Sequence, residues 1–417
     1  MTGPHDGDAQ ARRTADAVAR RSYGKLVAFL AACTRDVAAA EDALSDAFAA
    51  ALADWPVNGC PSNPEAWLMT VARRKTIDSA RRQAHRRDTT PHLQLMAEEL
   101  DAAAADSEIP DQRLALMFAC AHPAIDAGIR APLILQVVLG FDAATIASAF
   151  LMSPAAMGQR LVRAKNKILA ARIPFRIPDR VELSGRLDTV LDAIYAAFAE
   201  GWLDAAATDV ARRDLADEAI FLGRLVTELL PAEPEALGLL ALMLHAEARR
   251  RARRDGRGEY VPLAEQDPAL WDSQMIDEAE AILLRASALG SIGRYQLEAA
   301  LQSAHVDRRR TGRANWESVV QIYDALLALS GSPVVAINRA LAITEMHGAG
   351  AALHALQQIA GDARLTEYQP YWAARAELLA KTGAHAQARE AYEIAIGLER
   401  DPAVRRFLQQ RRSAIAP

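Results

Sequence analysis

Basic side chains are concentrated in one amphipathic segment, and they could neutralise the phosphates of a nucleic acid. Between residues 66 and 82 the apolar residues recur at helical spacing, and five bases accompany one acid, Asp78. An ordinary solvated helix face has the same composition, so this segment alone leaves both interpretations open. The five bases are Arg73, Arg74, Lys75, Arg81 and Arg82.

The stretch before this helix could hold an unstacked base. Residues 55–64 contain three prolines, a glycine and two asparagines, which predicts a loop, with Asn63 capping the helix that follows. Asn58, Ser62 and Asn63 offer small polar groups that can hydrogen-bond an extruded base, and Trp67 can stack on it. Packing in the protein core is the alternative role for Trp67.

A second basic segment has the pattern of two helices joined by a tight turn. We expect a short helix over residues 143–150, a turn over 151–153, and a second helix capped by Ser153. In a helix-turn-helix the second helix enters the major groove, where arginine reads guanine and glutamine reads adenine. A basic helix hairpin without DNA is the alternative. The residues expected to face DNA are Ser153, Ala155, Ala156, Gln159, Arg160, Arg163, Lys165 and Lys167.

An acidic and apolar helix face lies earlier in the chain, over residues 40–52. Glu41, Asp42 and Asp46 are helical neighbours around Phe48. Such a face suits docking to a basic helix of a partner protein. Taken alone, it is equally typical of an ordinary amphipathic helix.

The remaining candidates for chemistry are weak. Cys120 and His122 lack further ligands at metal-binding spacing, so we expect no metal. Six arginines over residues 249–257 could touch nucleic acid, but we expect a solvated loop. An enzyme acting through a helical pocket near Glu200 and Trp202 is a further alternative, but no residues at catalytic spacing support it. We therefore expect no enzymatic activity and no cofactor.

The composition favours an all-α protein. The 417 residues are 51 % hydrophobic and only 6 % aromatic, and few segments are rich in β-branched residues. The net charge of −5 is unevenly distributed: residues 1–180 carry 22 bases against 20 acids, and the remainder carries 26 against 33. An acidic average therefore does not exclude nucleic-acid binding by the first part.

The expected organisation has two small helical domains followed by a long helical extension. We place a flexible N-terminus at residues 1–16, the first domain at 17–88 and an acidic linker at 89–111. The second domain then occupies 112–175, and the extension occupies 181–417. The prolines of the sequence IPFRIP lie between the second domain and the extension.

We expect the protein to be cytoplasmic. Its N-terminus is polar, which does not fit a signal peptide, and its apolar runs are too short to span a membrane. Cys33, Cys60 and Cys120 are scattered, so we expect reduced thiols in a cytoplasmic protein.

The extension shows a repeat pattern near its C-terminal end. Small and large residues over 372–402 follow the spacing of a tetratricopeptide (TPR) repeat, in which stacked helix pairs bury each other's faces. A weaker match lies at Tyr323 and Pro333. The residues that carry the stronger match are Trp372, Ala376, Leu379, Gly383, Ala388, Tyr392, Ala395 and Pro402.

In this order, the three N-terminal segments resemble a bacterial RNA polymerase sigma factor of the extracytoplasmic-function (ECF) group. AEDALSDAFAAAL resembles the part of sigma domain 2 that docks on the β′ coiled coil, and WLMTVARRKTIDSARR resembles the helix that recognises the −10 element. The segment from DQRLALMF to VRAKNKI resembles sigma domain 4, which binds the −35 element. The resemblance implies core RNA polymerase, through its β′ and β subunits, and promoter DNA as partners.

The second half resembles the TPR-like C-terminal extension of one ECF subgroup. EGWLDA, PEALGLLALMLHAEARR, YQLEAALQSAHV and SPVVAINRALAI carry this similarity. The resemblance implies an extension that modulates the sigma factor, with a protein or peptide as its partner. The alternative is a helical TPR scaffold that binds a peptide or protein without recognising a promoter.

Overall fold

The computed structural model describes residues 4–84, 111–150, 152–203, 210–313 and 315–415. Within these residues every regular element is a helix, and the only β interaction is one antiparallel bridge between Arg254 and Tyr260. The all-α prediction is therefore confirmed. None of the described helices is long and apolar enough to cross a membrane.

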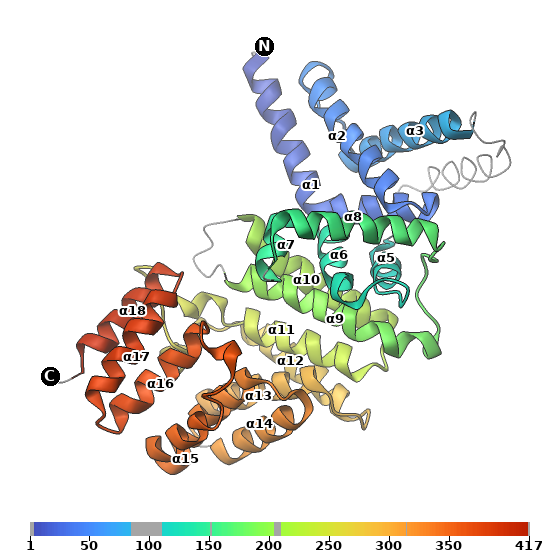
Figure 1. Ribbon diagram of the computed structural model, residues 1–417. Coiled ribbons are helices and arrows are strands. Elements are labelled where there is room, and N and C mark those ends of the chain that lie inside the picture. The colour runs from blue at the N-terminus through green and yellow to red at the C-terminus, as the bar shows by residue number, and fades with distance from the viewer. Residues whose placement is uncertain (1–3, 85–110, 151, 204–209, 314, 416–417) are drawn as a thin grey trace. The chain divides into compact units, whose positions relative to one another are not determined.

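The chain divides into two compact units, residues 1–201 with 209–222 and residues 202–208 with 223–417. Helix α10 (Val210–Leu229) therefore contributes to both (Figure 1). The other helices of the first unit are α1 (Pro4–Thr34), α2 (Val37–Asn58), α3 (Pro64–Ala84), α5 (Arg113–Cys120), α6 (Ala127–Val137), α7 (Ala143–Ala149), α8 (Pro154–Ala170) and α9 (Arg180–Leu203).

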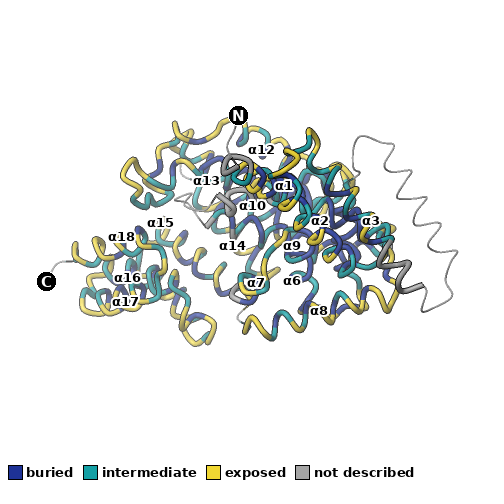
Figure 2. The backbone as a smooth tube through the Cα atoms, turned by 90° about the horizontal axis from the view of Figure 1, so that it is seen from above, coloured by how far each residue is buried: buried dark blue, intermediate teal, exposed yellow. Residues whose placement is uncertain are grey.

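Helices α1, α2 and α3 pack around a shared apolar core. Leu26 and Leu30 of α1, Leu44 and Trp55 of α2, and Leu68 of α3 are all at most 1 % exposed. Each such side chain contributes roughly 1.5–3 kcal/mol to stability relative to an exposed position. Figure 2 shows this burial along the inner faces of α1 and α2.

Two stretches of the first unit are more helical than expected. Residues 4–16, predicted as a flexible N-terminus, form the start of α1 because Ala11 and Ala15 are buried in its packing. Residues 55–58, predicted as loop, form the last turn of α2. Buried Trp55 anchors this turn although it contains Pro56, and the helix ends at Gly59, whose φ of 86° breaks the pattern.

The helices α5 to α8 form the second part of this unit. The core-facing stripe of α8 follows helical spacing through Met157, Leu161, Ala164 and Ile168, all buried. This part lies directly against α1, because a Cβ built on Gly24 would fall 1.9 Å from the backbone oxygen of Val138. Only glycine permits such close contact between the backbones. Except for Asp111, the predicted acidic linker lies outside the described residues.

The first unit also takes up residues that were assigned to the extension. Arg113 of α5 pairs with Asp111, with a nitrogen–oxygen distance of 2.7 Å, and with Glu218 of α10. Its guanidinium also lies 4.7 Å from the ring centre of Phe221. The expected boundary at residue 181 therefore precedes the observed division, because these contacts hold α10 against α5.

The second unit is an array in which each helix packs against its neighbours in the sequence. Glu235 of α11 accepts hydrogen bonds from the backbone of Tyr295 and Gln296, which fixes the start of α13. The helices are α11 (Pro234–Glu247), α12 (Ser273–Ser287), α13 (Arg294–Thr311), α14 (Trp316–Ser330), α15 (Pro333–Gln357), α16 (Gln369–Lys381), α17 (His385–Leu398) and α18 (Pro402–Ser413). The short 3₁₀ helices are η1 (Arg250–Arg253), η2 (Leu263–Glu265), η3 (Pro268–Leu270) and η4 (Ala363–Leu365).

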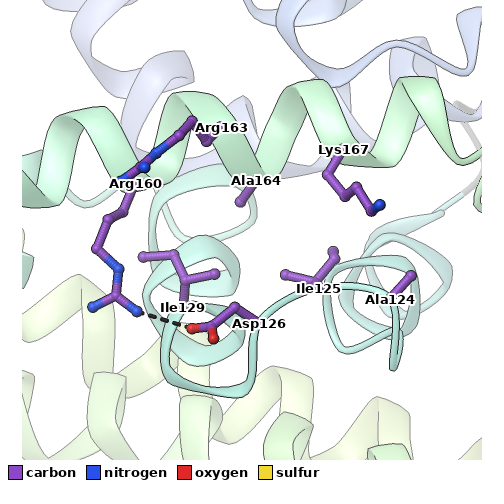
Figure 3. Close-up of a pocket in the computed structure, with 8 residues that line it drawn as sticks. All are labelled: Ala124, Ile125, Asp126, Ile129, Arg160, Arg163, Ala164 and Lys167. Carbon is purple, nitrogen blue, oxygen red and sulfur yellow. Dashed lines mark hydrogen bonds and ion pairs between the residues drawn. The ribbon is translucent and has the colours of Figure 1, made fainter.

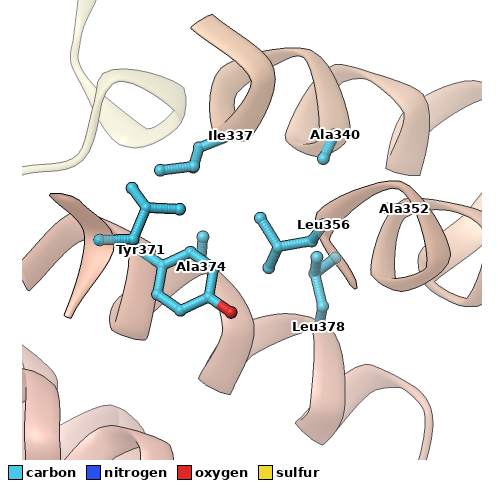
Figure 4. Close-up of a cluster of buried hydrophobic side chains, with 8 residues drawn as sticks. Ile337, Ala340, Ala352, Leu356, Tyr371, Ala374 and Leu378 are labelled. Carbon is cyan, nitrogen blue, oxygen red and sulfur yellow. The ribbon is translucent and has the colours of Figure 1, made fainter. Parts of the chain in front are cut away.

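A break in α15 shapes the core of the array. Gly348 has φ 80° and ψ 170°, which are not helical values. The helix therefore turns, and Leu356 from its second part packs with Ile337 from its first part and with Tyr371 of α16 (Figure 4). The helix pair α16 and α17 matches the predicted spacing, with Gly383 between them at φ 82°.

The arginine-rich segment 249–257 is not a solvated loop, and that prediction was wrong. Arg249 is only 7 % exposed, and Arg250–Arg253 form η1. The following turn is tied to the last helix of the array: Arg254 pairs with Asp401, and Arg406 pairs with Glu259 at 3.0 Å. These contacts, absent from any local pattern, make the segment part of the folded unit.

Candidate nucleic-acid interface

Helix α3 begins as the sequence predicts. The side chain of Asn63 accepts a hydrogen bond from the backbone N–H of Ala66 at 3.0 Å, and Pro64 occupies the first helical position. Because this cap uses the side-chain oxygen of Asn63, its amide nitrogen is the group left to meet a base. Ser62 beside it is exposed.

The basic face of α3 is partly engaged within the protein. Arg74 is exposed, whereas Lys75 lies 3.6 Å from Asp46 of α2 and Arg73 lies 5.2 Å from the ring centre of Phe29. The Lys75–Asp46 pair is exposed and therefore weak, so it leaves Lys75 able to exchange partners. Arg81 and Arg82 belong to the last turns of α3, and their side chains lie outside the described part of the structure.

Trp67 has the packing role that was the alternative for it. Its ring meets the buried Trp55 edge-on, with centroids 5.5 Å apart, and it is half-buried. One face of α3 thus anchors this aromatic pair in the bundle, and Arg74, two turns further along the helix, is exposed. Asn58, at the other side of the loop, donates a hydrogen bond to Asp54 at 2.7 Å and is exposed.

Helices α7 and α8 occupy nearly the ranges that the sequence predicts, and their helix-turn-helix role stays a prediction. They contact each other, and the hydroxyl of Ser153 accepts a hydrogen bond from the N–H of Ala156 at 3.3 Å, so it serves as the cap of α8. At the start of α8, Ala155 and Gln159 are exposed. These positions are therefore accessible to a ligand, and their contact with DNA stays a prediction.

A pocket of about 340 Å³ lies between α8 and the loop that leads into α6. Arg160, Arg163 and Lys167 line one side of it, and Asp126 lies opposite (Figure 3). Asp126 binds the guanidinium of Arg160 at 2.9 Å, whereas Arg163 and Lys167 are exposed. The pocket therefore presents two accessible cations beside one neutralised pair, a suitable environment for a phosphate group.

Lys165 does not share this exposed face. Its ammonium nitrogen lies 2.8 Å from a carboxylate oxygen of Glu41 in α2, and the two side chains are only 13 % and 16 % exposed. The ion pair therefore joins a residue predicted to bind DNA to one predicted to dock a partner protein. Sequence reasoning missed it because 124 positions separate the two residues and no local signal connects them.

The rest of the acidic face on α2 remains accessible. Asp42 and Asp46 are exposed and Phe48 is half-buried, so a partner can reach these three residues. Glu41 lies deeper than these three residues. It is close to Tyr23, whose own burial, with added repulsion from Glu41 and Asp42, raises the pKa of the phenol to about 12. Tyr23 is therefore neutral at physiological pH.

The described residues hold no cluster of three or more metal-ligating side chains. The ring of His122 accepts a hydrogen bond from the backbone N–H of Ala124 at 3.0 Å, which stabilises the turn before α6. Cys120 is fully buried, and this burial raises the pKa of its thiol. His122 thus stabilises a turn, and Cys120 is part of the apolar core.

Comparison with known sequences finds two families in the chain. A family described as Sigma-70 region 2 matches residues 18–86, which span most of α1 together with α2 and α3. A family of unknown function, DUF6596, matches residues 186–287. An uncharacterised protein of Rhizobium meliloti (strain 1021), R00370, is 40 % identical over 373 residues, which cover 87 % of each chain. No solved structure matches.

Proposed function

Because this chain belongs to the same family as the Rhizobium meliloti protein and contains a sigma-70 region 2, we propose that it is an ECF-type sigma factor that directs core RNA polymerase to specific promoters. The observation that carries the proposal is the region 2 match over residues 18–86. Those residues contain both the acidic face of α2 and the basic face of α3. This match by itself supports a sigma-factor-like role in transcription initiation, and the ECF type and the promoter specificity are the further steps of the proposal.

The proposed division of labour follows the accessible side chains. Arg74 and Lys75 on α3, with the exposed loop before it, bind the −10 element, while Gln159 and Arg163 on α8 bind the −35 element. Asp42, Asp46 and Phe48 on α2 dock the β′ subunit of the polymerase. Their exposure supports these assignments.

The Glu41–Lys165 pair has a consequence for this mechanism. While the pair is formed, Glu41 cannot bind a basic side chain of the polymerase, and Lys165 cannot bind a DNA phosphate. In the proposed mechanism, Glu41 and Lys165 can join these two surfaces only when the pair opens. The pair is mostly shielded from solvent, so salt screens it less than a surface pair.

The second unit is proposed to be a TPR-like regulatory extension rather than an enzyme. Its consecutive helices pack in sequence order, and α16 and α17 have the lengths and the connecting glycine typical of a repeat. A protein or peptide is the proposed ligand of this array.

Run-off transcription with core polymerase and a library of −35 and −10 sequences tests the proposal. We expect transcripts from a restricted set of promoters, and fewer of them when Arg74 is replaced by alanine. Absence of polymerase binding and of promoter-dependent transcripts would favour the scaffold alternative.

A shortened chain tests the regulatory role of the second unit. Ending the chain after Leu230 keeps α10 whole and so retains Glu218 and Phe221 beside Arg113. We expect promoter-dependent transcription by this variant to differ from that of the full chain. Equal transcription by the two chains would rule out regulation by the deleted helices.

A further inference from the structure

Four basic side chains meet inside the second unit, where the end of α11 lies against α13. They are His245 on α11, Arg249 between α11 and η1, and His305 and Arg308 on α13, together called the cationic cluster. They belong to neither of the predicted DNA-binding helices. Of the four, only Arg249 belonged to a segment singled out in the sequence, where a solvated loop was expected.

His245 and Arg249 are deeply buried without a hydrogen-bonded carboxylate. His245 is 0 % exposed, and neither of its ring nitrogens has a hydrogen-bond partner. Arg249 donates through Nε to the backbone oxygen of His245 at 3.2 Å and through Nη2 to the side chain of Gln302. Both acceptors of Arg249 are neutral, so its charge is solvated by dipoles alone.

The two members on α13 continue the cluster towards solvent. Nη2 of Arg308 lies 3.1 Å from Nδ1 of His305, and the guanidinium lies 3.9 Å from the ring centre of Trp316. Nη1 of Arg308 is buried without a hydrogen-bond partner. Arg308 and Gln302 are partly exposed, so this edge of the cluster reaches the surface.

The acids around the cluster do not neutralise it. The nearest, Glu280 of α12, has one oxygen 3.6 Å from Nε2 of His245, and its other oxygen accepts a hydrogen bond from Ser303 at 2.8 Å. Asp277 binds Arg310 at 3.3 Å. Glu345 attracts the charge of Arg308 and so favours its protonated form, but burial still lowers the pKa of Arg308.

The electrostatics agree with an excess of positive charge. Burial, followed by repulsion from neighbouring arginines, lowers the pKa of both His245 and His305 to about 4. Burial and the charge of Arg253 lower the pKa of Arg249 to about 10. A buried guanidinium without an anion is costly, and proteins usually supply a carboxylate or a bound anion at such places.

We propose that the cationic cluster is a binding site for a small oxyanion, carboxylate or phosphate, held by the guanidinium groups of Arg249 and Arg308. Guanidinium groups form paired hydrogen bonds with both kinds of oxyanion. The site goes beyond the proposed transcription function and does not depend on it. It gives the second unit a small anionic ligand of its own.

Thermal unfolding of the full chain tests the site with inorganic phosphate and with succinate, each compared with chloride at the same ionic strength. We expect one of the two anions to raise the midpoint saturably, by about 5 °C at a hundredfold excess over its dissociation constant. The anion that does so identifies the ligand class. A response no larger than that of chloride for both anions would overturn the proposal.

Substitutions locate the response. Arg249→Met keeps the apolar stem of the side chain and removes the guanidinium, so we expect it to abolish the shift. Arg254→Met is the matched control, because Arg254 is similarly shielded but has its own carboxylate, Asp401, and this variant keeps the shift. Retention of the shift in Arg249→Met would contradict the assignment.

A second variant and a direct measurement guard against a folding defect. Arg308→Gln lies at the accessible edge of the cluster, and we expect it to weaken binding at least tenfold in isothermal titration with the responding anion. Unchanged affinity in this variant would also contradict the site. Because the readout is anion binding, it is separate from any loss of transcription activity.

Discussion

Arg113 in the first unit and Arg249 in the second are buried to the same extent, 6 % and 7 % exposed, but only Arg113 meets carboxylates. Asp111 and Glu218 flank it, and Lys165 in the same unit pairs with Glu41. Arg249 meets a backbone carbonyl and an amide. The difference indicates that Arg113 holds helices of the first unit together, whereas Arg249 is a buried cation without a carboxylate, as the proposed anion site requires.

The largest expected effect comes from removing the partners of Arg113. The double variant Asp111→Asn with Glu218→Gln leaves a buried cation unpaired, which should lower the free energy of unfolding by about 3–5 kcal/mol. Urea unfolding of the full chain measures it. Asp324→Asn, which breaks the exposed pair with Arg339, is the control and should cost about 1 kcal/mol or less. Equal losses in both variants would remove the distinction between the two kinds of pair.

The second effect is a pH dependence of the second unit. The pKa of His245 in the fold is about 4, below its ordinary value of 6.5, so its contribution to stability is complete above pH 6.5 and is lost as the pH falls towards 4. Arg249, Arg310 and Glu280 are the charged groups that face it.

Replacing His245 by methionine should reduce this acid sensitivity. One pKa unit corresponds to about 1.4 kcal/mol, so the loss of stability between pH 7.5 and pH 5 should shrink by about 2 kcal/mol. Denaturant titrations at the two pH values give this difference. His122→Met, at a partly exposed turn of the first unit, is the comparison variant. An unchanged pH profile in His245→Met would show that the histidine is not held neutral by its surroundings.

The third effect concerns the contact between α2 and α8. Lys165→Glu places two acids together and should destabilise the first unit by about 1–2 kcal/mol, while the double variant with Glu41→Lys should restore most of the loss. Thermal unfolding of the four chains completes the cycle. Additive losses without rescue would show that the pair contributes nothing to the packing of these helices.

The smallest effect is a change in salt dependence on the exposed face of α8. Replacing Arg163 by alanine should lower the slope of log affinity for promoter DNA against log salt by about 0.9, the value of one phosphate contact. Arg160→Ala should change it less, because Asp126 already neutralises Arg160. Binding titrations over a salt series measure both slopes, and the reverse order would contradict the assignment.

Local patterns predicted much of the fold. The caps at Asn63 and Ser153 marked the starts of α3 and α8 correctly. Such features depend on neighbours within four residues, which the sequence displays directly. The errors fell where distant contacts override a local preference, as at Pro56, where buried Trp55 keeps α2 helical to Asn58.

By itself, the sequence determined the all-α class, the basic faces of α3 and α8, and the resemblance that the region 2 match supports in part. Only the tertiary structure decided which charges are available. It turned Lys165 towards Glu41, and it buried Arg249 where a solvated loop was expected. The physical reason is that the residue type determines the charge of a side chain, whereas helices far away in the chain determine its counterion and its exposure.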